Sequence, residues 1–228
     1  LLFDGETGQM QAALDGDTLT ARRTAAASAL AADLLARKDA GDLLIVGTGQ
    51  LSLAVAAAHC AVRGYTSVSI WGRSGEKAAV IASTLGEQGL PARAVDDLET
   101  ACRAADVIST VTASTRPIIQ GDWLKPGSHL DLIGAFKGDM RESDDQAILQ
   151  AEVFVDLRAG ASLAGDLSQP LEAGQITPEH IRADLAELCQ GSHAGRSDDS
   201  ARTVFKSAGM ALQDLAAATM ASDHTILG

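Results

Sequence analysis

Aromatic residues and cysteines are scarce in this chain of 228 residues, and long apolar runs are missing. The three cysteines, Cys60, Cys102 and Cys189, are far apart. They fit neither a disulfide framework nor a zinc site, so we expect reduced thiols buried as small apolar side chains. The histidines also lack the close spacing of zinc ligands. No stretch reaches the roughly 18 apolar residues of a membrane-spanning helix. These absences predict a cytoplasmic protein with no metal site and no membrane segment.

Positive charge is also in short supply. Lys and Arg number 18 against 30 Asp and Glu, which gives a net charge of -12 at pH 7. An acidic surface repels phosphate backbones, so we exclude nucleic acid as a partner, whereas a small anion held by a few local donors is still compatible. Hydrophobic residues at 46% and charged residues at 21% are typical of globular proteins and exclude a disordered or fibrous chain.

Short apolar segments alternate with helical ones through most of the chain. Strands are predicted over residues 43–46, 68–71, 92–95, 106–110, 129–133 and 153–156. Helices are predicted over residues 20–38, 50–62, 76–85 and 98–105. Continuous apolar runs suit strands that are buried on both faces. The alternation therefore predicts an α/β fold with a Rossmann-type, doubly wound parallel sheet.

The two chain ends do not follow this alternation. Residues 1–14 are typical of a hairpin, which is only marginally stable without more sheet. Residues 177–179 look like the start of a helix, and residues 204–220 predict a long amphipathic helix with no strand after it. We therefore expect both ends to form parts of a second, discontinuous domain. The unpartnered hairpin also predicts a further segment upstream of Leu1, the alternative being a trimmed terminus with nothing lost.

A glycine loop is the sharpest functional signal. The pattern Gly47-x-Gly49-x-x-Ser52 directly follows the predicted strand 43–46 and opens the predicted helix 50–62. The first glycine permits a tight turn, the second lets a pyrophosphate approach the backbone, and Ser52 is small enough for helix–strand packing. The predicted cofactor-binding residues of this loop are Gly47, Thr48, Gly49, Gln50 and Leu51. The alternative is a glycine-rich turn in an α/β domain that binds no ligand.

The end of the next predicted strand distinguishes between cofactors. Enzymes that use NAD place an acidic residue there to bind the ribose 2′-hydroxyl. Here the strand is followed by Arg73 and Ser74, and Lys77 comes one helical turn later. A guanidinium group suits a phosphate through paired hydrogen bonds. These three residues predict NADP(H) in preference to NAD(H), unless Arg73 is only a solvated loop charge.

Hydroxyl groups cluster after the predicted strand 106–110. Thr110, Thr112 and Ser114 would face the crevice at the carboxyl ends of the strands, where ligands bind in open α/β sheets. Ala135, after the following strand, would face the same crevice and line its nicotinamide side. The alternative is a turn that is merely rich in Ser and Thr. No residue is identified as the general acid, so the catalytic residues are unknown.

Several segments together resemble the ornithine cyclodeaminase/mu-crystallin family, in the family's order and over the full chain. They are Asp17-x-Leu19-Thr20-x-x-Arg23-Thr24-Ala25-Ala26, the glycine loop, Ile70-Trp71-Gly72-Arg73-Ser74, Thr112-x-Ser114, Gly134-Ala135-Phe136 and Thr203-Val204-Phe205-Lys206-Ser207-x-Gly209-x-Ala211-x-x-Asp214. The resemblance implies that Arg23 binds the substrate carboxylate and that Thr24 contacts the cofactor. It also implies a homodimer and an upstream segment with a substrate-binding Arg and Lys.

The same resemblance suggests three regions. Residues 1–22 would be a remnant of the substrate and dimerisation domain, and residues 23–200 the dinucleotide-binding domain. Residues 201–228 would be a C-terminal helix that returns to the first region.

Phe136 departs from the ornithine cyclodeaminase pattern. Those enzymes place a catalytic Asp at about this position, and an aromatic ring cannot replace its charge. The departure points to the imine-reducing branch, with NADPH-dependent reduction of a cyclic ketimine such as Δ1-pyrroline-2-carboxylate or Δ1-piperideine-2-carboxylate. The alternatives are a cyclodeaminase or amino-acid dehydrogenase of the same family, and a non-catalytic protein that binds NADP(H) and a small ligand.

Overall fold

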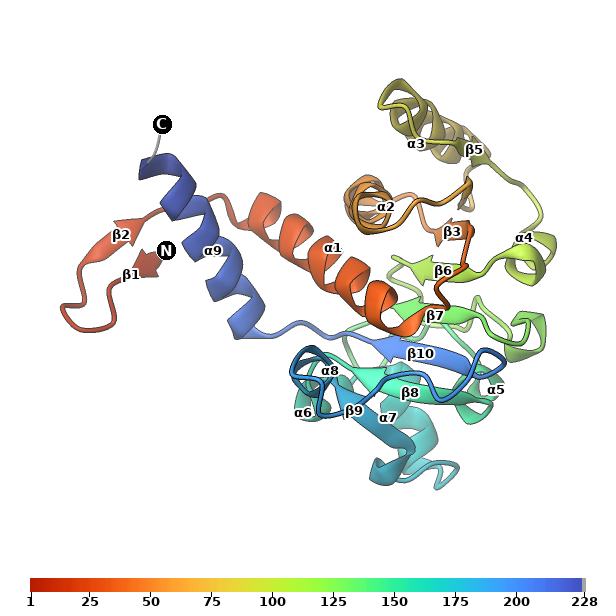
Figure 1. Ribbon diagram of the computed structural model, residues 1–228. Coiled ribbons are helices and arrows are strands. Elements are labelled where there is room, and N and C mark those ends of the chain that lie inside the picture. Colours follow the sequence, from red (N-terminus) through yellow and green to blue (C-terminus); the bar gives the residue numbers. More distant parts are fainter. Residues whose placement is uncertain (227–228) are drawn as a thin grey trace.

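An eight-stranded parallel sheet forms the centre of the protein in the computed structural model, which describes residues 1–226 (Figure 1). Its strands are β3 (Asp42–Val46), β4 (Ser67–Trp71), β5 (Ala92–Ala94), β6 (Val107–Thr110), β7 (His129–Leu132), β8 (Ala151–Val155), β9 (Ile181–Asp184) and β10 (Arg202–Lys206). They lie in the order β5-β4-β3-β6-β7-β10-β8-β9, and all neighbours are parallel. The predicted doubly wound fold is confirmed.

Helices cover both faces of this sheet (Figure 1). They are α1 (Gly16–Leu35), α2 (Gln50–Val62), α3 (Gly75–Glu87), α4 (Leu98–Ala104), α5 (Asp145–Leu149), α6 (Arg158–Ala161), α7 (Gly165–Glu172), α8 (Leu185–Cys189) and α9 (Ala211–Ile226), with 3-10 turns at Gly121–Trp123 and Pro178–His180. Leu43 and Ile45 pack with α1, α2 and α3 on one face, whereas Leu44 and Val46 pack with α4, α5 and α7 on the other. Among the described residues, no helix combines the length and apolar character needed to cross a membrane.

Helix α1 starts earlier than the sequence predicts. The Asp15 side chain caps it by accepting a hydrogen bond from the backbone N–H of Thr18 at 2.8 Å. Arg23 is therefore about two turns inside the helix rather than near its start. The predicted domain boundary between residues 22 and 23 consequently falls within a continuous helix.

The C-terminal prediction is wrong in its first part. Residues 204–206 belong to β10, which lies between β7 and β8 in the sheet, and α9 begins only at Ala211. Val204 and Phe205 are fully buried between the helical layers, so burial outweighs any helical pattern. The helix start expected at residues 177–179 is a single 3-10 turn that leads into β9. Residues 227 and 228, the end of the predicted C-terminal region, lie outside the described residues.

The predicted hairpin forms, and it stands apart from the main sheet (Figure 1). Its strands, β1 (Leu2–Phe3) and β2 (Met10–Ala12), pair only with each other. Helix α9 lies beside α1 and contacts β1, so the two chain ends come together. The division into a nucleotide domain and a discontinuous second domain stays a prediction.

The three cysteines are free and lie in different environments. Cys102, a residue of α4, is fully buried, as expected, and burial raises its pKa to about 12. Cys60 is partly buried, whereas Cys189 is exposed, so the prediction of a buried thiol is wrong at position 189.

Candidate functional site

A crevice of about 630 Å³ opens at the carboxyl ends of β3, β4 and β6. Its lining residues are Gly47, Thr48, Gly49, Trp71, Gly72, Arg73, Ser74, Lys77, Val111, Thr112, Ala113, Ser114, Thr115, Arg116 and Ile118. The chain runs from β3 to β4 and β5 on one side and resumes with β6 on the other, so the strand order reverses between β3 and β6. Ligands of open α/β sheets bind at such a reversal.

The glycine loop is shaped for close approach of a ligand. Gly47 has a φ of 130°, and a Cβ added there would lie 2.9 Å from Val111 Cγ2, so only glycine fits. The buried Ser52 hydroxyl donates to the Gly47 carbonyl at 2.9 Å and fixes the turn. Gly49 begins α2 without a side-chain cap, which leaves amide donors of the first turn free. A pyrophosphate fits this uncapped helix start.

Three cations line the crevice together with the glycine loop. Gly72 comes so close to the glycine loop that an added Cβ would lie 2.4 Å from Thr48 Cγ2, which brings Arg73 beside that loop. Arg73, Lys77 and Arg116 are exposed, and within residues 1–226 none of their side chains makes an ion pair or hydrogen bond. Unpaired cations in a chain of net charge -12 mark a local site for an anion.

The structure places only some of the predicted cofactor residues in the crevice lining. These are Gly47, Thr48, Gly49, Arg73, Ser74, Lys77, Thr112 and Ser114. Gln50 and Leu51 lie in the first turn of α2 outside the lining, and Thr110, Ala135 and Thr24 are buried. The role of each residue in binding a cofactor stays a prediction.

Sequence reasoning missed several residues of the lining. Trp71, Arg116 and Ile118 line the crevice, and each lies within a few positions of a predicted residue. Trp71 is the last residue of β4, and that position is a signal because strand ends face the same edge of a parallel sheet. Arg116 and Ile118 lie further along the loop after β6 and carry no such local signal.

A buried ionic cluster lies next to the crevice and was also missed. Lys206 at the end of β10 pairs with Asp166 at 2.9 Å and donates to the Ala135 carbonyl. Glu142 is fully buried, and desolvation raises its pKa even though the nearby Lys206 lowers it. Lys206 does occur in a quoted segment, but there it carried only the family resemblance, and Glu142 was not singled out.

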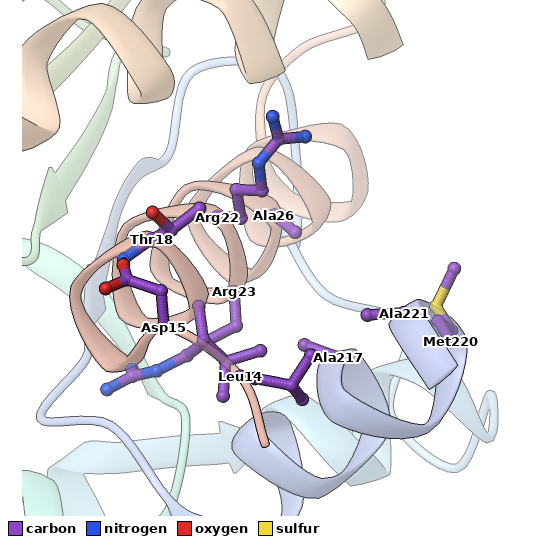
Figure 2. A pocket seen from close by; sticks show the side chains of 10 residues that line it. Leu14, Asp15, Thr18, Arg22, Arg23, Ala26, Ala217, Met220 and Ala221 are labelled. Atoms are coloured by element: carbon purple, nitrogen blue, oxygen red, sulfur yellow. The ribbon is translucent and has the colours of Figure 1, made fainter. Parts of the chain in front are cut away.

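Arg23 lines a second cavity, of about 520 Å³, between α1 and α9 (Figure 2). Arg22 and Arg23 point to different sides of α1 (Figure 2). Arg23 Nε lies 2.8 Å from Asp214 Oδ1, and its guanidinium packs against Gly209, where an added Cβ would lie 2.8 Å from Nη1. Gly209 follows β10, so Arg23 lies beside a loop at the carboxyl ends of the strands. Its binding of a substrate carboxylate stays a prediction.

The chain matches the model of the ornithine cyclodeaminase/mu-crystallin family over residues 1–227. It belongs to this family. It is 41% identical to the Δ(1)-pyrroline-2-carboxylate reductase of Paracoccus denitrificans over 94% of this chain and 69% of that protein. It is 38% identical to the ketimine reductase mu-crystallin of Mus musculus, over 98% and 68%. The solved Δ(1)-pyrroline-2-carboxylate reductase of Thermococcus litoralis, in complex with NADH and L-proline, superimposes with a TM-score of 0.95 at 30% identity and covers 98% of this chain and 70% of that chain.

Proposed function

We propose that this protein is an oxidoreductase that reduces the C=N bond of a cyclic ketimine carboxylate. The observation that carries the proposal is the crevice, where a glycine loop and an uncapped helix start face a group of unpaired cations. The names of the two relatives describe reductases of ketimines, and the Thermococcus structure contains NADH and L-proline. When bound, a nicotinamide cofactor supplies the hydride, and this chain's residues supply binding and orientation.

The cofactor in this proposal is NADP(H). Arg73 occupies the position where an acidic residue would bind an unmodified ribose, and Lys77 and Arg116 add charge nearby. The amide donors at the start of α2 would hold the pyrophosphate. The nicotinamide end would then extend away from Arg73, toward the loops that follow β6 and β7.

The proposed substrate is Δ1-pyrroline-2-carboxylate or Δ1-piperideine-2-carboxylate. Arg23 would bind the carboxylate, which a guanidinium can hold through paired hydrogen bonds. Phe136 follows β7 with 54% of its surface exposed, and the Lys137 ammonium lies 5.5 Å from its ring centre. A ring at this position cannot supply the negative charge on which ornithine deamination depends.

An assay of NADPH oxidation with each cyclic imino acid tests this function. We expect turnover with at least one ring size and no release of ammonia from ornithine. Release of ammonia coupled to proline formation would favour a cyclodeaminase instead. Binding of NADPH without turnover of either imino acid would favour a non-catalytic binding protein.

The proposal includes a homodimer and a location in the cytoplasm. Leu1, Phe3 and Met10 of the hairpin are exposed, and strand edges of this kind favour pairing. We propose that the hairpin and α9 form the dimer contact, with the nucleotide domains outermost. Light scattering that gives a monomer at micromolar concentration would contradict the dimer. The cytoplasmic location rests on the three free cysteines.

A further inference from the structure

One buried carboxylate, Glu142, joins two loops at the edge of the crevice. Its Oε1 accepts hydrogen bonds from the backbone N–H of Thr112 at 2.7 Å and from the Thr112 hydroxyl at 2.8 Å. Its Oε2 accepts from the backbone N–H of Gly134 at 2.8 Å and of Ala135 at 3.1 Å. Thr112 follows β6 and Gly134 follows β7, so both oxygens together hold two neighbouring strand ends in one arrangement.

The two loops are also too close for any side chain at Gly134. A Cβ there would lie 2.1 Å from the Thr112 carbonyl oxygen and 2.4 Å from Glu142 Oε1. The close packing of the two loops therefore depends both on glycine at position 134 and on the carboxylate at position 142. The hydrogen bonds supply the attraction, and the missing side chain permits the approach.

Hydrogen bonds to Asp166 hold the backbone of Glu142 in place. Asp166 Oδ1 accepts from the backbone N–H groups of Glu142 and Ser143, both at 2.9 Å. Asp166 Oδ2 pairs with Lys206 Nζ at 2.9 Å, and Lys206 also donates to the Ala135 carbonyl. The side chains of Lys206 and Asp166 are fully buried. The cluster thus connects the end of β10 to the same two loops.

We infer that Glu142 is a positioning residue, which fixes the loops of Thr112 and Ala135 so that the nicotinamide end of the cofactor is held at the correct distance from substrate. The inference rests on the proposed function, because it assigns the nicotinamide end to these loops. Glu142 contacts neither ligand in this scheme and acts through the backbone of its partners. The adenosine end, beside Arg73, is independent of it.

Glu142→Gln is the informative variant. The amide keeps the volume but presents one oxygen and one NH₂ group, which cannot accept a hydrogen bond from an N–H donor. One pair of loop bonds is therefore lost. Asp106→Asn is the matched control, because Asp106 is also a buried carboxylate and accepts from the backbone N–H groups of Gly41 and Asp42. It lies before β6, at the other end of that strand from Thr112.

The first measurement is amide hydrogen exchange of the full chain without ligand. In Glu142→Gln we expect exchange to become about tenfold faster either at Thr112 or at Gly134 and Ala135, whichever faces the new NH₂ group, and to stay unchanged at all three in Asp106→Asn. Unchanged exchange at these amides in Glu142→Gln overturns the inference, whatever the protein catalyses. If Glu142→Gln does not fold, Thr112→Val removes the hydroxyl bond to Glu142, together with the bond that this hydroxyl accepts from the Ser114 N–H at 3.3 Å, and the same three amides are read.

The second measurement compares ligands that do and do not reach these loops. We expect Glu142→Gln to bind NADPH about tenfold more weakly and 2′-phospho-ADP-ribose as tightly as the native chain. Its kcat should fall more than its KM rises, and Glu142→Asp should recover part of the loss. Equal weakening of both ligands overturns the positioning role. A native chain that binds both ligands but turns over no imino acid contradicts the proposed function, while the exchange data still test the role of Glu142 in holding the loops.

Discussion

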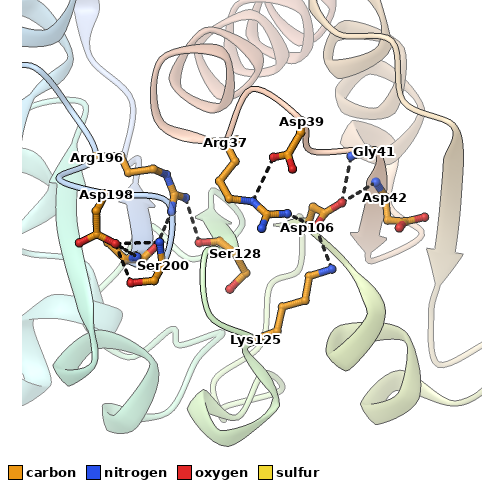
Figure 3. A network of polar contacts seen from close by, with 12 residues as sticks. Arg37, Asp39, Gly41, Asp42, Asp106, Lys125, Ser128, Arg196, Asp198 and Ser200 are labelled. Carbon is orange, nitrogen blue, oxygen red and sulfur yellow. Dashed lines mark hydrogen bonds and ion pairs between the residues drawn. The ribbon is translucent and has the colours of Figure 1, made fainter.

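The amino ends of the strands and the crevice at their carboxyl ends carry similar cations in opposite states of pairing. At the amino ends of the strands, Asp106 accepts from Arg37 Nη2 at 2.8 Å and pairs with Lys125 Nζ at 2.7 Å (Figure 3). Arg196 donates there to the carbonyl of Ser128 (Figure 3) and to that of Leu35. At the carboxyl ends, Arg73, Lys77 and Arg116 have no such partners among the described residues.

Charges that are paired at the amino ends of the strands stabilise the fold, whereas the unpaired charges of the crevice are available to bind a ligand. Arg196 ties the C-terminus of α1 to the loops before β7 and β10, and Asp106 ties the start of β3 to the start of β6. Among the described residues, the unpaired cations therefore mark the crevice as a place for an anionic group.

The largest effect on stability is expected from removing the carboxylate of Asp106 at the amino ends of the strands. Asp106→Ala leaves Arg37 and Lys125 without their shared carboxylate and two backbone N–H groups without an acceptor. We expect the free energy of unfolding in urea to fall by about 3 kcal/mol, as for other broken buried pairs. NADPH affinity of the folded protein should stay unchanged. A loss of affinity without a loss of stability would reverse the assignment of the two ends.

In the crevice at the carboxyl ends of the strands, Arg73→Ala should change ligand binding but not the free energy of unfolding. We expect NADPH affinity to fall by about 1.5–3 kcal/mol, the range of a charged hydrogen bond, and NADH affinity to change little. Arg182→Ala on β9 is the control, because it removes the same charge from an exposed position outside the crevice. Calorimetric titration of both cofactors measures the difference. Equal losses for NADPH and NADH would exclude a contact with the 2′-phosphate.

The sequence predicts the crevice lining far better than the buried polar contacts. The glycine loop and Arg73 follow strands at fixed spacings, so local patterns are enough to place them. Glu142 and Asp106 gain their roles from contacts with residues that are distant in the sequence, such as Thr112 and Lys125. Strand β10 was mistaken for helix for the same reason, since its neighbours β7 and β8 come much earlier in the chain. No local pattern reports such contacts.

Acid should lower the free energy of unfolding through His129, at the amino ends of the strands. This residue begins β7, is fully buried, and its Nδ1 lies 2.9 Å from Thr203 Oγ1, to which Arg196 also donates. Burial lowers the pKa of His129 to about 3 in the folded chain. Below about pH 6.5 the imidazole is therefore protonated in the unfolded chain while it is still neutral in the folded chain. Between these values the free energy of unfolding should fall by about 1.4 kcal/mol per pH unit.

Urea unfolding between pH 7 and pH 5 measures this slope. His129→Gln should flatten it, since glutamine does not titrate and still offers a hydrogen-bonding group to Thr203. The carboxylate of Asp106 contributes at lower pH, because its pKa is held below the ordinary value by Lys125 and by backbone N–H groups despite partial desolvation. The stability that Asp106 supplies is thus lost only as the pH falls toward that lowered pKa. An unaltered slope in His129→Gln would assign the acid sensitivity to other groups.

The smallest effect is expected at Ser74, which belongs to the fold and to the predicted phosphate site together. Its hydroxyl caps α3 by accepting from the backbone N–H of Lys77, at a long 3.4 Å, so Ser74→Ala should lower the free energy of unfolding by only about 0.5–1 kcal/mol. Asp97→Ala removes the corresponding cap of α4, at 3.1 Å from the Thr100 nitrogen, outside the crevice. Both variants should lose stability in urea, but only Ser74→Ala should also weaken NADPH relative to NADH. If the two variants bind NADPH equally well, Ser74 is a helix cap alone, and the recognition of a 2′-phosphate rests on the unpaired cations.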